Sequence, residues 1–184
     1  MNKAEVVSYF NLTELEVKKI DLFINSIIAY NKHTNLIGKS TIKNIWDRHI
    51  LDCLQITSHI KNKSCKILDL GTGAGLPGVL FSIVGYQNVL MVDSIKKKTD
   101  FINSVSKDLS LSAKTENKRI ENLVTNKNEI IVSRALAPLK KLLSYSIRHS
   151  DNKTTLYFLK GKNVNFEINK AKDFFLFEYK KIKS

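Results

Sequence analysis

The sequence predicts an α/β fold with a mostly parallel, twisted sheet, helices on both faces and a set of preceding N-terminal helices. Two observations predict it. From residue 66 onward, short apolar runs alternate with helical segments, which is typical of a parallel sheet. Before residue 60, apolar residues recur at helical spacing. With 184 residues, we expect one compact unit in which a helical extension, residues 1–60, packs on a core of residues 61–184.

The N-terminal region is predicted to be helical from Thr13, which forms a capping-box pattern with Glu16. The apolar residues that mark one face of this helix are Val17, Ile20, Ile24, Ile27 and Ile28. Residues 31–40 are polar and turn-like, with Gly38 as a break. A second helix is expected over residues 42–60. Its expected inner residues are Ile45, Trp46, His49 and Ile50.

The remainder of the chain is predicted to form strands and helices in alternation. Buried strands are expected at residues 66–70, 88–93, 129–133 and 154–159, and weaker strands at 113–116 and 174–179. Helices are expected between them at residues 77–84, 95–109 and 138–149. The sequence shows no internal repeat and no long linker.

A glycine-rich loop follows the first expected strand, where residues 66–78 read KILDLGTGAGLPG. Gly71, Gly73 and Gly75 permit a tight turn and let a ligand approach the backbone closely. Leu76 stands where the dinucleotide fingerprint requires its third glycine, so a nucleotide-dependent oxidoreductase is the least favoured class. The spacing Gly-x-Gly-x-Gly resembles the first motif of class I S-adenosylmethionine-dependent methyltransferases.

An acidic residue supports a ligand site at this loop. Asp93 ends the second expected strand, VLMVD, and lies 20 residues after Gly73. A carboxylate there can accept hydrogen bonds from ribose hydroxyls. The structural alternative is a plain tight turn with a surface aspartate.

The charge of the chain favours a polyanionic partner. The formal net charge is +13, and the pI is near 9.7. Residues 1–60 carry 7 basic and 6 acidic side chains, whereas the remainder carries 23 and 11. Such a field attracts nucleic acid or anionic lipid. A solvated, lysine-rich surface explains the same composition without a partner.

Several segments together resemble the bacterial small-subunit ribosomal RNA 7-methylguanosine methyltransferases, the family of glucose-inhibited division protein B. In chain order the matching segments are Tyr30-Asn31-Lys32 with Asn35-Leu36, Arg48-His49-Ile50-Leu51-Asp52, GTGAGLPG at 71–78, Val92-Asp93-Ser94 with Lys97, Arg119-Ile120-Glu121, Ser133-Arg134-Ala135 and Leu159-Lys160-Gly161. They cover about residues 12–161. Tyr30 replaces the family's usual tryptophan, and Cys53 its usual serine. The long C-terminal hairpin of the family is expected to be shortened here.

The resemblance implies a Rossmann-like class I methyltransferase that uses S-adenosylmethionine to methylate guanine N7 in 16S ribosomal RNA of the small ribosomal subunit. The cofactor contacts that it implies by position are Gly71, Leu76, Ile120, Glu121 and Arg134; Gly73, Gly75 and Asp93 join them from the loop pattern.

No residue pattern for a catalytic base or nucleophile is expected for this reaction, because guanine N7 carries a lone pair and loses no proton before attack. Catalysis then comes mainly from positioning two reactants. The candidates for such roles are Arg134, His49 and Lys160. A surface arginine, a packed histidine and a surface lysine are the structural alternatives. No metal site is expected.

Other reactions and locations are disfavoured. Cytosine C5 methylation uses a cysteine after proline, and neither Cys53 nor Cys65 follows one. Both are expected to be reduced packing residues. We expect a cytoplasmic protein, because no signal peptide or membrane span is evident, and a monomer, because nothing in the sequence requires a dimer. Two alternatives stay open: a methyltransferase of the same fold acting on another RNA or on protein, and a basic RNA-binding or assembly factor with a vestigial cofactor pocket.

Overall fold

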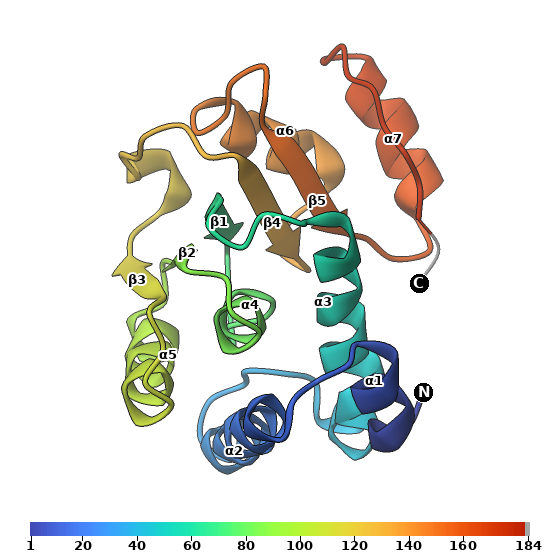
Figure 1. Cartoon of the computed structure of the whole chain (residues 1–184). Helices are drawn as coiled ribbons and strands as arrows, with labels where there is room; N and C mark the ends of the chain where they lie inside the picture. Colours follow the sequence, from blue (N-terminus) through green and yellow to red (C-terminus); the bar gives the residue numbers. More distant parts are fainter. Residues whose placement is uncertain (183–184) are drawn as a thin grey trace.

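A computed structural model describes residues 1–182 of the chain (Figure 1). The N-terminal elements are α1 (Lys3–Tyr9), α2 (Glu14–Tyr30), the 3₁₀ helix η1 (Lys39–Asn44), the π-helix η2 (Trp46–Leu51), α3 (Asp52–Leu54) and the 3₁₀ helix η3 (Gln55–His59). The α/β part comprises β1 (Lys66–Leu70), α4 (Gly78–Ile83), β2 (Asn88–Asp93), α5 (Lys96–Asp108), β3 (Lys114–Asn117), η4 (Ile120–Asn122), β4 (Ile130–Arg134), α6 (Leu139–Ile147), β5 (Thr155–Leu159) and α7 (Val164–Lys172).

The five strands form one parallel sheet in the order β3-β2-β1-β4-β5, which confirms the predicted fold class. The chain runs from β1 outward to β2 and β3 and then returns to build β4 and β5 on the other side of β1. The strand order therefore reverses between β1 and β4. In open α/β sheets, ligands bind outside the carboxyl ends of the strands at this reversal.

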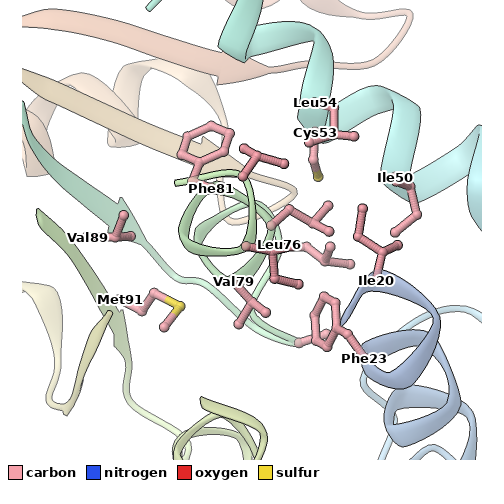
Figure 2. Close-up of a cluster of buried hydrophobic side chains, with 14 of the residues drawn as sticks. Ile20, Phe23, Ile50, Cys53, Leu54, Leu76, Val79, Phe81, Val89 and Met91 are labelled. Carbon is pink, nitrogen blue, oxygen red and sulfur yellow. The ribbon is translucent and has the colours of Figure 1, made fainter. Parts of the chain in front are cut away.

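Each face of the sheet is covered by a separate layer. Along β1, Ile67 joins the larger apolar cluster, whereas Leu68 and Leu70 join the cluster on the opposite face. The larger cluster contains buried side chains from α2, α4 and α5, and Figure 2 shows Phe23 of α2 beside Val79 and Leu76. On the other face lie η4 and α6, and α7 packs against α6.

The first predicted helix is confirmed as α2. Thr13 Oγ1 accepts the Glu16 amide at 3.3 Å, and the Glu16 carboxylate accepts the Thr13 amide at 2.8 Å, so the capping box forms as expected. The buried residues of α2 are Ile20, Phe23, Ile24 and Ile27. This apolar face packs on α4 and α5. The short helix α1 was not expected from the sequence.

The continuous helix expected over residues 42–60 is instead a succession of 3₁₀, π and α turns from Lys39 to His59. The prediction of helical structure was correct, but that of one regular helix was wrong. A contact between distant parts of the chain accompanies the change. In the π turn, the carbonyl of Arg48 accepts a hydrogen bond from Arg134, 86 residues away, at 2.9 Å. Local periodicity carries no information about such a partner.

The strand expected at residues 174–179 was also wrong. This segment is irregular, and α7, which was not expected, precedes it. Phe175 and Phe177 pack against the α6–α7 cluster, while Leu176 between them is fully exposed. The alternation therefore has the period of a strand, but it reflects a chain that lies against helices.

Candidate functional site

The strand reversal places two segments side by side. The glycine loop, residues 71–77, follows β1, and residues 135–138 follow β4, its hydrogen-bonded neighbour. Leu136 of the second segment lies over Gly71, where a Cβ atom would come within 2.5 Å of the leucine Cδ1. Ser133 Oγ donates to the Leu70 carbonyl at 2.9 Å and ties the two strand ends together. The loop after β1 and the loop after β4 are therefore fixed against each other.

The glycines of the loop are required by its backbone. Gly71, Gly73 and Gly75 have φ values of +67°, +60° and +87°, in the left-handed region that other residues rarely adopt. A Cβ on Gly75 would lie 2.5 Å from Val79 Cγ2. A Cβ on Gly73 would meet only the Gly71 carbonyl oxygen, at 3.8 Å. The loop is therefore packed tightly at both ends and open at Gly73, where a ligand can reach the backbone.

Asp93 is placed against this open point. Its Oδ2 accepts the Gly73 amide at 3.0 Å, and its Oδ1 accepts the Ile95 amide at 2.9 Å. The residue is 8% exposed, and each carboxylate oxygen keeps a further lone pair. The acid therefore fixes the loop and keeps acceptor capacity for hydroxyl groups beside it.

Arg134, at the end of β4, reaches the N-terminal helical segment. Its Nη2 donates to the carbonyl of Arg48 at 2.9 Å and to Nδ1 of His49 at 2.8 Å, and its Nη1 lies 3.9 Å from the sulfur of Cys53. The guanidinium thereby joins the sheet to the π turn η2. The structure thus brings together Arg134 and His49, two of the three residues predicted to position the reactants.

The hydrogen bonds fix the tautomer of His49. A guanidinium only donates, so Nδ1 of His49 accepts and its proton lies on Nε2. Nε2 then donates to Thr41 Oγ1 at 2.7 Å, and the Thr41 hydroxyl donates to the Gly38 carbonyl at 2.7 Å. Burial, together with the charge of Arg134, lowers the pKa of His49 to about 4. The imidazole is therefore neutral at physiological pH and serves as a link between Arg134 and Thr41.

Two solved structures with a similar fold are named as a methylase and as a putative RNA methyltransferase. The chain superposes on ribosomal protein L11 methylase from Lactobacillus delbrueckii with a TM-score of 0.58 and 18% identity, over 67% of this chain and 66% of that one. It superposes on a putative RNA methyltransferase from Pyrococcus horikoshii with a TM-score of 0.51 and 16% identity, over 65% and 63%. At these identities the likeness concerns the fold alone.

Sequence comparison decides the family. The model of the family described as rRNA small subunit methyltransferase G matches residues 16–184. The chain belongs to this family. Curated relatives named ribosomal RNA small subunit methyltransferase G include one from Rickettsia typhi, 39% identical over 89% of this chain and 84% of its own length. Another, from Orientia tsutsugamushi, is 35% identical over 95% of this chain and 87% of its own length.

Two positions carried over from the methyltransferase G family lie with their side chains in the core. Leu76 is 5% exposed and Ile120 is 8% exposed. They can offer a ligand mainly backbone groups. The segment that carries Ile120 is held beside the acid of β2, because the Lys118 amide and the Asn117 side chain both donate to the carbonyl of Asp93, at 3.1 and 3.0 Å.

Glu121, the next carried-over position of the methyltransferase G family, is exposed, and its side chain is turned toward α6. Its Oε1 accepts a hydrogen bond from the Tyr145 hydroxyl at 3.1 Å, and its carbonyl accepts one from Arg148 Nη1 at 2.8 Å. Tyr145 lies in α6, and Arg148 follows its last residue. In this structure the carboxylate of Glu121 therefore contributes to the anchoring of α6.

Lys160 is the third residue that was predicted to position the reactants. The structure pairs its ammonium with the Glu167 carboxylate of α7 at 2.6 Å and with the Ala137 carbonyl at 2.9 Å. The same Glu167 oxygen accepts the Leu139 amide at the start of α6, at 2.7 Å. Lys160 thus binds structural partners that hold α6 and α7, and it makes no hydrogen bond to Arg134 or His49.

Asp69 was missed by the sequence reasoning. It is fully buried within β1, and its Oδ2 accepts the Gly78 amide at 2.9 Å, which fixes the far end of the glycine loop. Burial raises the pKa of Asp69 to about 7. The available signal was an acid in the middle of an otherwise apolar strand, because such a residue is rarely buried without a specific hydrogen bond.

Other kinds of site find no support in residues 1–182. No group of three or more His, Cys, Asp and Glu side chains in this range is arranged to hold a metal ion. Every helix in the same range is too short or too polar to cross a lipid bilayer. Cys53 and Cys65 are both buried and unpaired with each other.

Proposed function

We propose that this protein transfers a methyl group from S-adenosylmethionine to N7 of a guanine in the 16S ribosomal RNA of the small ribosomal subunit. The observation that carries the proposal is the junction of the open glycine loop with Asp93 at the strand reversal, in a chain of the methyltransferase G family. Relatives from Rickettsia typhi and Orientia tsutsugamushi are named for small-subunit ribosomal RNA.

The residues at the strand reversal fit this cofactor. The bare backbone at Gly73 leaves room for close approach, and Asp93 offers acceptors for ribose hydroxyls next to it. Backbone groups at Leu76 and Ile120 flank the same edge of the sheet. When bound, the sulfonium supplies an electrophilic methyl group. The protein's own part is to orient that group toward the incoming base.

The groups around Arg134 suit a reaction that needs no proton transfer. Neutral guanine presents N7 as a lone pair, so the attacking atom needs no base. His49 is engaged at both ring nitrogens, and its low pKa makes it a poor proton acceptor. Rate enhancement then comes from holding the base in line with the methyl donor. Arg134 and His49 act by placing the surrounding segments.

The net charge of +13 supports a polyanionic substrate. Most of the excess lies beyond residue 60, in the part that carries the glycine loop. Ribosomal RNA satisfies this requirement, and it is the substrate class in the names of the curated relatives.

A methyl-transfer assay tests the proposal. Purified protein and radiolabelled S-adenosylmethionine are incubated with small ribosomal subunits that lack the modification, and the RNA is digested and its nucleosides separated. We expect label in 7-methylguanosine. The matched variant Asp93→Asn should lose cofactor affinity and label together. Label in another nucleoside or in a ribosomal protein, or a wild-type protein that transfers none, would refute the assignment.

A further inference from the structure

Residues 35–39 form an exposed segment that is joined by hydrogen bonds to the residues around Arg134 and that the proposed function does not use. Residues 35–39 line a shallow depression, and we call them the 35–39 segment. Its outer positions Asn35, Gly38 and Lys39 are exposed, Leu36 is half-buried and Ile37 is buried. The depression therefore offers an amide, an ammonium group and an apolar side chain. Amide and ammonium groups can hydrogen-bond to the edge of an unstacked nucleobase, and an apolar side chain can contact its ring.

The segment is held from behind by one buried side chain. Asn31 is 4% exposed, and its Oδ1 accepts the amides of Leu36 at 2.7 Å and Ile37 at 3.1 Å. Its Nδ2 donates to the Ile37 carbonyl at 3.1 Å. Three hydrogen bonds from one buried amide fix the backbone of the segment before any ligand arrives.

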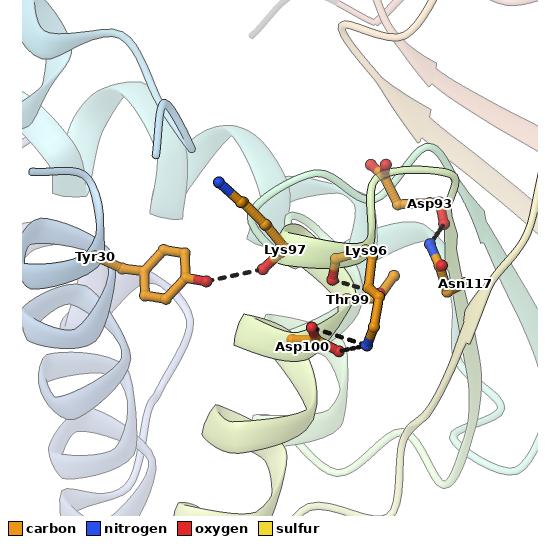
Figure 3. A network of polar contacts seen from close by, with 7 residues as sticks. All are labelled: Tyr30, Asp93, Lys96, Lys97, Thr99, Asp100 and Asn117. Atoms are coloured by element: carbon orange, nitrogen blue, oxygen red, sulfur yellow. Dashed lines mark hydrogen bonds and ion pairs between the residues drawn. The ribbon is translucent and has the colours of Figure 1, made fainter. Parts of the chain in front are cut away.

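The chain on either side of the 35–39 segment is anchored by Tyr30 and by Thr41, at residues that follow β2 and end β4. On one side, the Tyr30 hydroxyl donates to the Lys97 carbonyl at 3.1 Å, in the first turn of the helix that follows Asp93 and β2 (Figure 3). On the other side, Thr41 is joined through His49 to Arg134 at the end of β4. Because β1 lies between β2 and β4, the two anchors flank the carboxyl end of β1.

We propose that the 35–39 segment binds the target guanine base, and that Thr41, through His49 and Arg134, positions it against the methyl donor. The inference rests on the proposed function and adds the base-binding residues that it lacks. Asn35 and Lys39 face the polar edge of the purine, and Leu36 contacts its ring. Thr41 is a positioning residue, because it touches the segment and the histidine but no reacting atom.

Asn35→Ala tests the binding role. Asn35 is exposed and makes no hydrogen bond to residues 1–182, so its removal should leave the free energy of unfolding unchanged. We expect kcat/KM for unmodified small subunits to fall about tenfold, with the cofactor Kd unchanged within twofold. The matched control is Asn103→Ala, at an exposed position of α5, and it should behave as the wild type.

Thr41 variants test the positioning role. Thr41→Val keeps the shape and removes the hydroxyl, whereas Thr41→Ser keeps the hydroxyl. The valine variant should lower kcat/KM for subunits about tenfold at unchanged cofactor Kd, and the serine variant should restore it within about threefold. Nitrogen NMR of the wild type should show His49 protonated at Nε2 alone, with no titration between pH 5 and 8, and this signal should shift in the valine variant.

The outcomes separate the two proposals. A wild-type protein that labels no 7-methylguanosine overturns both. An active wild type with an Asn35→Ala variant of equal kcat/KM overturns the base-binding role alone. Equal activity of the valine and serine variants, loss of cofactor affinity in step with activity, or a His49 proton on Nδ1 overturns the positioning role.

Discussion

At the scale of single residues, Gly71 is constrained by both its conformation and its surroundings. Its φ is +67°, and an added Cβ would meet the Leu136 side chain at 2.5 Å. Gly71→Ala should therefore lower the free energy of unfolding by at least about 1 kcal/mol, the cost of a left-handed residue, and weaken cofactor binding. Urea denaturation and calorimetry measure the two effects. Gly161→Ala is the control, because nothing lies within 4 Å of its Cβ; equal losses in both variants would contradict the prediction.

His49 gives a prediction for pH. Its pKa falls from 6.5 to about 4 on folding, so the unfolded chain binds more protons between these two values. Its contribution to stability is complete above pH 6.5 and is lost as the pH falls toward 4. The pKa of the buried acid Asp69 is raised to about 7, so its contribution to stability changes with pH in the opposite direction. The pH dependence of wild-type stability therefore does not report on His49 alone.

The variant His49→Gln isolates the histidine. The difference in free energy of unfolding between wild type and His49→Gln should shrink as the pH is lowered from 6.5 to 4, because every other group is common to both proteins. Chemical denaturation at four or five pH values measures it. A difference that stays constant over this range would mean that the buried imidazole does not resist protonation.

At the scale of elements, α6 and α7 depend on one carboxylate. Glu167 accepts the Leu139 amide at the start of α6 and pairs with Lys160. Glu167→Ala should destabilise the protein by about 1–2 kcal/mol, because an amide and an ammonium group each lose a partner. Hydrogen exchange should accelerate first in α7. The control is Glu178→Ala at an exposed position, which should leave the free energy of unfolding and the hydrogen exchange of α7 unchanged.

A variant of Lys160, combined with Glu167→Ala, tests whether the role of this lysine is structural. If its role is structural, Lys160→Met and Glu167→Ala should be non-additive in a double-mutant cycle, with activity falling only in proportion to the folded fraction. Additive effects, or an RNA affinity that drops in Lys160→Met while stability holds, would return Lys160 to the positioning role that its place after β5 suggested.

Those elements also show what the sequence can predict. The five strands and the helices α4, α5 and α6 were placed within about two residues, whereas α7 was missed; most of these strands are buried apolar runs that the sequence shows directly. The glycine loop and Asp93 were found because their chemistry is local. The strand expected at residues 174–179 failed because a period of two also arises where an irregular chain lies on helices. The hydrogen bonds that link Thr41 through His49 to Arg134 could not be predicted, because they join residues 93 positions apart only after the sheet has formed.

At the scale of the whole molecule, the charge predicts how binding responds to salt. With a net charge of +13, affinity for an unmodified 16S ribosomal RNA fragment should fall at least about tenfold between 50 and 200 mM salt, linearly on logarithmic axes. Filter binding measures it. Cofactor affinity should stay nearly constant over the same range. If RNA affinity depended as little on salt concentration as cofactor affinity does, the basic surface would take no part in RNA binding.

The packing of α2 has a consequence for biosynthesis. Its apolar face, with Ile20, Phe23 and Ile27, is buried against α4 and α5, whose residues are translated some fifty to eighty positions later. While the ribosome makes them, this face lacks the two helices that it packs on. The nascent chain therefore exposes these apolar side chains until α4 and α5 have been made, and a chaperone at the tunnel exit can cover them in the meantime.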